Sequence, residues 1–245
     1  MNRIESILTG LAACLYPPRC PVCGQILYPA DQRICPECRK KLPVIDGPRC
    51  ARCSKPVEKE EEEYCYDCAR RTFLCEKGFA LWKYDRVTAE SVAAFKFRGR
   101  REYVIFYAQE AVRLAESFLW RNRPDYLVPV PLHKKRLAAR GYNQAALLAE
   151  RIEKLTGIPY VPLLIRTRNT KPQKELNDKG RGRNVEDAFA LSKGEWRRLP
   201  GIPDTVLLVD DIYTTGSTVE ACAAALREAG VRHVLFLTLC IGRGF

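Results

Sequence analysis

The sequence has no apolar run of the length that a membrane span requires. A transmembrane helix needs about 18–20 consecutive apolar residues, and no segment of this chain approaches that length. The nearest match to a signal-peptide core, residues 7–16, runs into Pro-Pro-Arg-Cys where a cleavage site would need small residues. Its apolar residues share one helical face, which favours a packing helix. We therefore expect a cytoplasmic protein without membrane insertion.

Acidic residues are scarce relative to basic ones. The 245 residues include 29 Asp and Glu against 41 Lys and Arg, which gives a net charge of +12. Such an excess favours phosphate-rich partners, although it does not say which phosphates. The length allows one sizeable core and one small additional module.

Residues 206–218, VLLVDDIYTTGST, contain the pattern that is most informative about function. Four apolar residues predict a buried parallel strand, and the carboxylates Asp210 and Asp211 follow it. A hydroxyl-rich stretch with one glycine then leads into a helical pattern. Backbone N–H groups and the helix dipole bind anions at such a strand-to-helix turn, and nearby carboxylates suit sugar hydroxyls or hydrated magnesium. The segment predicts a ligand with a phosphate beside a ribose; the loop residues are Thr214, Thr215, Gly216, Ser217 and Thr218.

Other phosphate-related motifs fit residues 206–218 poorly. A Walker A loop needs a lysine that is absent here, and a receiver domain has its acidic pair near the N-terminus with a phospho-acceptor strand and a lysine after it. A buried strand with a solvated turn leaves the acidic pair and the loop composition unexplained. The segment resembles the 5-phosphoribosyl-1-pyrophosphate (PRPP) signature of type I phosphoribosyltransferases.

Eight of the twelve cysteines form four CxxC pairs before residue 76. Eleven residues separate the first pair from the second and the third from the fourth, so the unit repeats at an offset of 30. Two such pairs complete a tetrahedral Cys₄ zinc site. A disulfide framework, the alternative, suits small secreted domains. We expect two structural zinc ions in an N-terminal module of residues 1–76, with sequential ligation preferred over interleaved; the ligands are Cys20, Cys23, Cys35, Cys38, Cys50, Cys53, Cys65 and Cys68.

Residues 77–245 alternate between strand and helix patterns. We expect strands at residues 79–84, 126–130, 160–165, 205–209 and 233–240, and helices at residues 103–120 and 144–155. This alternation predicts an α/β domain with a parallel sheet that binds ligands at the carboxyl ends of its strands.

Three clusters of basic residues lie between or after these strands. The first contains Lys134, Arg136 and Arg140 and leads into Asn143 and Gln144. The second is residues 166–183, a long segment without apolar periodicity, as is typical of a lid or binding loop; its candidates are Lys171, Lys174 and Arg181. The third is Lys96, Arg98, Arg100 and Arg101. For each cluster, the alternative is a solvated basic surface.

The order of these motifs resembles that of the ComF family of competence-associated, phosphoribosyltransferase-like proteins, over nearly the full chain. The paired CxxC module is followed by VPVPL, RGYNQ, a basic loop with TKPQKEL and RGRN, and residues 206–218. The resemblance implies a type I phosphoribosyltransferase fold with an N-terminal double zinc ribbon. It also implies a role in natural transformation, with single-stranded DNA and competence proteins such as a DNA-translocating ATPase as partners. It does not specify the acceptor of a phosphoribosyl group.

The resemblance further implies roles for the site residues. Asp210 and Asp211 would hold the ribose hydroxyls, the magnesium shell, or both, and residues 214–218 would bind the 5-phosphate. Basic residues of the first two clusters would bind pyrophosphate, which a nitrogen nucleophile would displace from the anomeric carbon. Two departures argue against a purine acceptor and allow a binding-only site: Thr214 replaces the carboxylate of several purine-salvage relatives, and Tyr213 replaces a small aliphatic residue.

The second functional hypothesis is a non-catalytic adaptor that binds single-stranded DNA and keeps a PRPP-type site. In the third cluster, Phe95 and Phe97 alternate with basic residues. Cations can bind a nucleic-acid backbone there, and aromatic rings can stack on bases.

Overall fold

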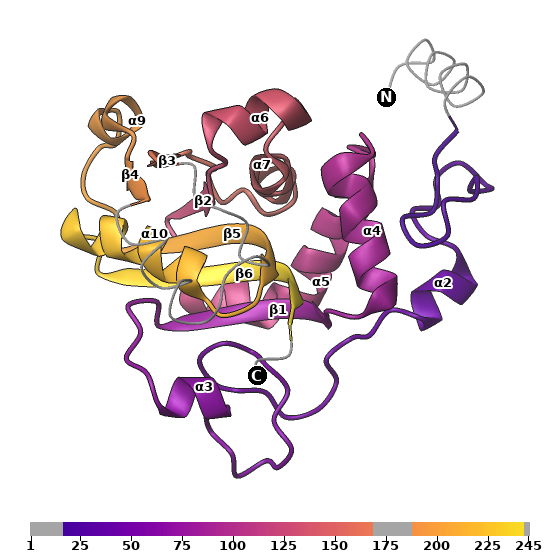
Figure 1. The fold of residues 1–245 in the computed structure, drawn as a ribbon, viewed down its shortest axis with the longest axis horizontal. Helices are drawn as coiled ribbons and strands as arrows, with labels where there is room; N and C mark the ends of the chain where they lie inside the picture. Colours follow the sequence, from indigo (N-terminus) through magenta and orange to yellow (C-terminus); the bar gives the residue numbers. More distant parts are fainter. Residues whose placement is uncertain (1–16, 169–187, 243–245) are drawn as a thin grey trace.

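The computed structural model describes residues 17–168 and 188–242. Its centre is a four-stranded sheet with the order β1-β6-β5-β2, in which all neighbouring strands are parallel (Figure 1). The strands are β1 (Lys77–Lys83), β2 (Tyr126–Pro129), β5 (Thr205–Tyr213) and β6 (His233–Ile241). The expected α/β class, a parallel sheet flanked by helices, is confirmed.

Helices cover both faces of the sheet. On one face, α5 (Tyr103–Asn122) packs against α7 (Gln144–Thr156) and β1, and α7 reaches β2 and β5. On the other face, α10 (Ser217–Glu228) packs against β5 and β6. The two long helices predicted from periodicity are therefore present, because their apolar residues recur at the spacing of one helical face.

Helix α4 (Arg86–Phe97) precedes α5 and was not among the predicted helices. Its N-terminus is fixed by a capping box, in which the Asp85 carboxylate accepts from the Thr88 N–H at 2.9 Å and the Thr88 hydroxyl accepts from the Asp85 N–H at 2.9 Å. This signal is visible in the sequence. The helix ends at Phe97, within the third basic cluster.

The prediction of a sheet strand at residues 160–165 was wrong. Only Tyr160 pairs with β2, through an isolated parallel bridge to Leu127, while β3 (Leu164–Arg166) pairs antiparallel with β4 (Phe189–Leu191) in a separate two-stranded sheet. Pro159 and Pro162 explain the difference, since proline has no N–H to donate to a strand ladder. A short helix, α9 (Lys193–Arg197), follows β4.

Alternate residues of the strands point into two separate cores. Leu207 and Val209 belong to the core beneath α4, α5 and α7, whereas Val206 and Leu208 belong to the core beneath α10. Successive side chains of a strand alternate between its faces, so a strand covered on both sides is apolar throughout.

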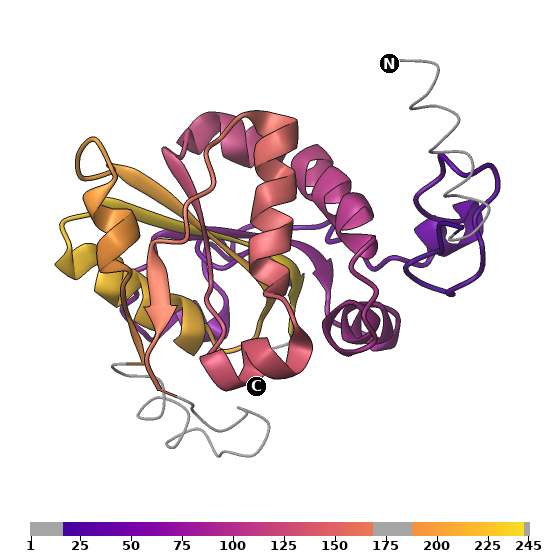
Figure 2. The same ribbon diagram turned by 90° about the horizontal axis from the view of Figure 1, so that it is seen from above.

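The two cysteine-rich units join different cores. The first unit contains α2 (Pro36–Lys40) and packs beside α4 and α5, with Cys20, Leu27 and Cys38 in their core (Figures 1 and 2). The second contains α3 (Tyr66–Ala69) and lies on the other face of the sheet, with Cys50 and Cys53 in the core of α10. The N-terminal units therefore cover both sides of the α/β domain, and the boundary at residues 76/77 remains a prediction.

Polar contacts attach each unit to the domain. Arg39 of α2 pairs with the buried Glu110 of α5 at 2.7 Å. On the opposite face, Glu220 of α10 accepts hydrogen bonds from the backbone N–H groups of Leu74 and Cys75 at 2.7 and 3.1 Å.

None of the helices within the described ranges combines the length and apolarity that crossing a bilayer would demand.

Candidate functional site

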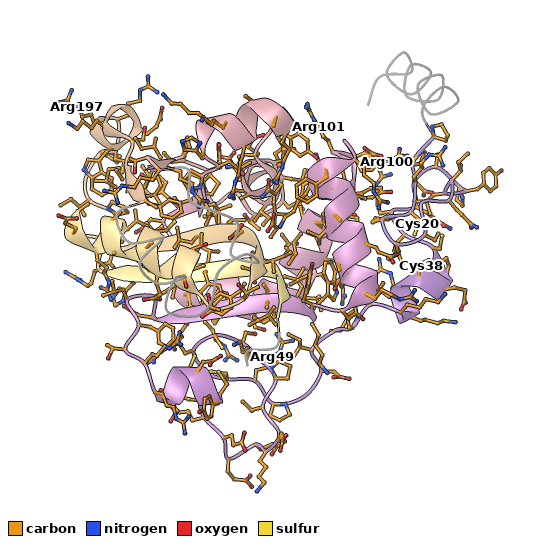
Figure 3. All side chains as sticks on the ribbon, in the orientation of Figure 1. Cys20, Cys38, Arg49, Arg100, Arg101 and Arg197 are labelled. Atoms are coloured by element: carbon orange, nitrogen blue, oxygen red, sulfur yellow. The ribbon has the colours of Figure 1, made fainter. Side chains whose placement is uncertain are left out.

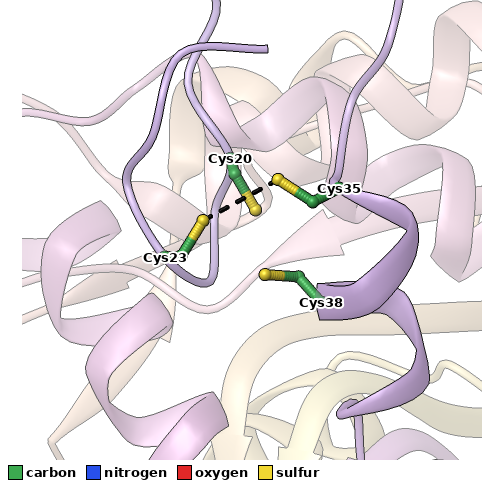
Figure 4. A group of neighbouring side chains, drawn as sticks. All are labelled: Cys20, Cys23, Cys35 and Cys38. Carbon is green, nitrogen blue, oxygen red and sulfur yellow. Dashed lines mark hydrogen bonds between the residues drawn. The ribbon is translucent and has the colours of Figure 1, made fainter.

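The cysteines form two separate groups of four. Cys20, Cys23, Cys35 and Cys38 make one group and Cys50, Cys53, Cys65 and Cys68 the other; within each, all Sγ atoms lie within 4.8 Å of one another. Figure 4 shows the four thiols of the first group converging on one point. The ligand order is therefore sequential.

The spacing of the sulfur atoms fits zinc. The Sγ atoms of Cys23 and Cys35 are 3.8 Å apart, and those of Cys53 and Cys65 are 3.6 Å apart. Four sulfurs at the Zn–S distance of about 2.3 Å in a tetrahedron are separated by about 3.8 Å. Burial, followed by the neighbouring thiols, raises the pKa of Cys38 to about 12. A bound cation is what stabilises such a group as thiolates.

The carboxylates Asp210 and Asp211 lie inside β5 and not after it, because pairing with β6 continues to Tyr213. Asp211 forms an ion pair with Lys96 of α4, with Oδ1 2.7 Å from Nζ and side chains only 6% and 16% exposed. Its Oδ2 atom is buried and has no hydrogen-bond partner among the described residues. Lys96, predicted as a nucleic-acid contact, is therefore also part of the acidic site.

Asp210 is the more unusual carboxyl group. Its Oδ1 accepts from the Asp211 N–H at 2.8 Å. Burial, followed by the charge of Asp211, raises the pKa of Asp210 to about 7, although Lys96 and Arg166 act in the opposite direction. Two adjacent carboxylates in a poorly solvated position are stabilised by hydroxyl donors or by a divalent cation.

The loop between β5 and α10 has the geometry expected of an anion site. Gly216 has φ +81°, and a Cβ atom there would lie 2.4 Å from the Tyr213 hydroxyl, so only glycine fits. The hydroxyls of Thr215 and Ser217 are 2.9 Å apart, and Ser217 is the first residue of α10. Thr214 and Thr218 flank them, and the first turn of α10 directs free N–H groups toward this loop.

Tyr213 forms the floor of the loop. Its ring stacks on Phe236 with centroids 4.7 Å apart and planes at 6°. Phe236 in turn lies against Gly78 of β1, where a Cβ atom would be 2.0 Å from the ring. The tyrosine that departs from the usual signature is thus a packing residue, and burial raises its pKa.

A basic pocket of about 390 Å³ lies between the C-terminal end of α4 and α6 (Lys134–Arg140). It brings together Lys96 and Phe97 with Arg136, Arg140 and Tyr142. The Arg140 guanidinium lies 4.8 Å from the Phe97 ring centroid and donates to the Gln144 side chain. Members of the first and third basic clusters, which are separate in the sequence, therefore share one pocket.

The remaining predicted residues have varied positions. Asn143 caps α7, with its Oδ1 accepting from the Ala145 N–H, and donates to the Val130 carbonyl at 3.0 Å. Arg100 pairs with Glu102 at 3.5 Å, and Arg101 lies over Tyr142 at 4.5 Å from its centroid, both near the molecular surface (Figure 3). Lys134 and Arg98 are exposed. Lys171, Lys174 and Arg181 lie outside the described residues.

A second pocket, of about 630 Å³, lies between the second cysteine unit and the ends of β1 and β6. Its lining includes Lys55, Asp67, Lys83 and Gly242. The Gly242 N–H donates to the Tyr213 carbonyl at 2.8 Å, so this pocket adjoins the anion loop.

Comparisons with known proteins agree with the cysteine geometry. Residues 11–69 match the family described as the double zinc ribbon domain. The two groups of four are the zinc-binding sites of this double ribbon.

Similarity to known competence proteins over most of the chain shows its family. Competence protein F of Haemophilus influenzae is 30% identical over 226 residues, which are 88% of this chain and 93% of that protein. Competence protein ComFC of Bacillus subtilis is 31% identical over 210 residues, 83% of this chain and 82% of that protein. The chain belongs to the ComF family of competence proteins.

Other relatives of this ComF chain are named as DNA utilization proteins. DNA utilization protein YhgH of Salmonella typhimurium is 30% identical over 180 residues, 72% of this chain and 77% of that protein. Among solved structures, a purine phosphoribosyltransferase from Pyrococcus horikoshii overlaps with a TM-score of 0.34 at 12% identity, over 57% of this chain and 87% of that chain.

Proposed function

We propose that this ComF protein binds PRPP with magnesium at the carboxyl end of its sheet and acts as a phosphoribosyltransferase-like protein in natural transformation. The observation that supports this most strongly is the continuous unit of β5, loop and α10. It joins two adjacent carboxylates, one of them in a buried ion pair, to a loop in which only glycine fits at position 216. Relatives named as competence and DNA utilization proteins support the biological setting.

Each part of PRPP has a counterpart in the site. The 5-phosphate would accept from the hydroxyls and N–H groups of residues 214–218. The ribose hydroxyls would donate to Asp210 and Asp211, which would also hold a hydrated magnesium ion. The pyrophosphate would lie toward Lys134, Arg136 and Arg140, and a lid formed by residues 166–183 stays a prediction because most of it lies outside the described residues.

The chemistry follows from this placement. A nitrogen nucleophile attacks the anomeric carbon as the bond to the pyrophosphate oxygen breaks, and positive charge develops on the ribose ring. Arg136 and Arg140 stabilise the departing pyrophosphate, and the Asp210 and Asp211 carboxyls lie beside the developing charge. Bound magnesium would supply further charge neutralisation for the leaving group.

We place the acceptor in the 630 Å³ pocket, with the second zinc ribbon as a hood over the strand ends. This pocket adjoins Thr214 through Gly242, whose added Cβ would lie 3.5 Å from the threonine methyl group. Thr214 cannot act as a base near neutral pH, and the Asp67 carboxylate of this lining is already ion-paired with Lys55 at 2.5 Å. The acceptor's proton would therefore pass to water or to the departing pyrophosphate.

Ligand-induced thermal stabilisation tests the proposal. At a PRPP concentration of 100 times Kd, binding stabilises a protein by about 2.7 kcal/mol, which corresponds to a rise in unfolding midpoint of about 5–10 °C at this size. The rise should require magnesium and be lost in Asp211→Asn. Asp204→Asn is the matched control, since Asp204 is exposed and precedes the opposite end of β5. A midpoint that PRPP leaves unchanged would contradict the proposal, and pyrophosphate release during an acceptor screen would extend it to catalysis.

A further inference from the structure

The 390 Å³ pocket has the charge of an anion site and lies directly beside the acidic pair. Three of its lining residues, Lys96, Arg136 and Arg140, are basic, and none is acidic. The Lys96 ammonium group connects the pocket to Asp211 at 2.7 Å. The Arg140 Nε atom is buried and has no hydrogen-bond partner among the described residues. The pocket therefore offers charge and a donor to a ligand of opposite sign.

An exposed aromatic ring stands at the edge of this pocket. Phe97 is 72% exposed although it is large and apolar. Arg140 covers it at 4.8 Å from the ring centroid, while Tyr142 is buried beneath Arg101. Cations together with an accessible ring are the combination that binds single-stranded nucleic acid, since every base has a face that can stack. The volume lies within the range of small-ligand pockets, about 300–1,000 Å³, and has room for one nucleotide.

We propose that single-stranded nucleic acid and PRPP compete for this pocket. A base of the strand stacks on Phe97, and the adjoining phosphate takes the positions at Arg136 and Arg140 that the pyrophosphate of PRPP would occupy. The inference rests on the proposed function for the position of pyrophosphate. Through this competition, PRPP would regulate strand binding. The strand would weaken PRPP binding by the same factor, because coupling between two ligands is reciprocal.

Displacement from the full-length zinc-loaded protein tests the competition. A fluorescent oligodeoxythymidine is bound at constant ionic strength, and its anisotropy is followed as magnesium PRPP or magnesium pyrophosphate is added. Sulfate at the same ionic strength is the control for general screening, which weakens all phosphate contacts. We expect either competitor to raise the apparent Kd of the strand about tenfold or more at saturation, and sulfate to have a much smaller effect.

Substitution of the ring provides a second readout. Phe97→Leu keeps an apolar side chain but removes one stacking face, so strand affinity should fall about tenfold, the size of one base stack. Trp120→Leu is the matched control. Trp120 is 70% exposed and also carries an arginine over its ring, but it lies near the far end of α5, about 25 Å along the helix from Tyr103.

The outcomes separate this inference from the proposed function. Simultaneous binding of strand and PRPP, absence of strand binding, or equal effects of the two leucine variants would overturn the competition. If PRPP does not bind at all, the proposed function fails. In that case, displacement of the strand by pyrophosphate and the effect of Phe97→Leu on strand affinity still test whether the strand binds in this pocket.

Discussion

Gly216 is the residue on which the anion loop depends most directly. Its φ of +81° is unfavourable for any other residue, and an added Cβ would also meet the Tyr213 hydroxyl at 2.4 Å. Gly157, the residue after α7, has a similar φ of +76° but nothing within 4 Å of an added Cβ. Substitution of Gly157 therefore tests the cost of the left-handed backbone alone, whereas substitution of Gly216 adds the steric conflict with Tyr213.

We predict that Gly216→Ala destabilises the protein more than Gly157→Ala. The control should cost about 1 kcal/mol for its left-handed backbone, and Gly216→Ala about 1–3 kcal/mol more because the packed tyrosine must shift. Only Gly216→Ala should weaken PRPP binding. Urea unfolding and PRPP titration of both variants measure this, and equal behaviour of the two would argue against a rigid loop.

Asp210 predicts a pH dependence with a definite sign. Its pKa is raised to about 7 by burial and by Asp211, whereas an aspartate in the unfolded chain titrates near ~3.9. Between these values the folded state retains a proton that the unfolded state has released, so stability falls as the pH rises from about 4 to about 7.

Asp210→Asn should remove this loss of stability. Asp204→Asn contains the same zinc sites and therefore controls for their response to pH. Compared with that variant, the free energy of unfolding of Asp210→Asn should rise by on the order of 2 kcal/mol between pH 5.5 and pH 8. Urea unfolding without magnesium or PRPP measures the difference. Parallel stability curves for the two variants would mean that Asp210 is ionised in the folded protein throughout this range.

At the level of elements, helix α5 holds the first zinc ribbon through one buried carboxylate. Glu110 is 5% exposed and pairs with Arg39 of the ribbon at 2.7 Å and with Arg113 of its own helix at 2.6 Å. Removal of a partner from a buried, charged hydrogen bond costs about 1–3 kcal/mol.

We therefore predict that Glu110→Gln speeds zinc release from the first ribbon and not from the second. Glu116→Gln is the control, since Glu116 is exposed on the same helix. Zinc transfer to a chromogenic chelator would show two phases of equal amplitude, with only one accelerated. Acceleration of both phases, or of neither, would show that this contact does not hold the ribbon in place.

Some of these elements and contacts could be predicted from the sequence, and others could not. Local spacing predicted the zinc ligands, α5 and α7, because CxxC pairs and helical periodicity depend only on near neighbours. The contact between Lys96 and Asp211 was out of reach, since it joins two distant segments through tertiary packing. The strand expected at residues 160–165 could have been rejected from sequence, because Pro162 interrupts its ladder.

For the whole molecule, the two ribbons lie against opposite faces of one sheet, so metal and fold should be coupled. Cys23→Ser and Cys53→Ser should each leave one of two zinc ions, since the ligand groups are separate. Removal of both ions should lower the unfolding midpoint of the sheet itself, because cysteines of each ribbon contribute to its two cores. Metal analysis measures the zinc content. Tryptophan fluorescence, to which the buried Trp82 (1% exposed) contributes, follows the unfolding of the sheet. An unchanged midpoint after chelation would mean that the ribbons are independent of the domain.

A calorimetric titration of magnesium PRPP into the full-length protein and into Asp210→Asn/Asp211→Asn tests the phosphoribosyl site itself. We predict saturable binding at one site per chain in the wild type, and none in the double variant at matched stability. Absence of heat in both proteins, or equal affinity in both, would contradict the assignment of β5, its loop and α10 as a phosphoribosyl site.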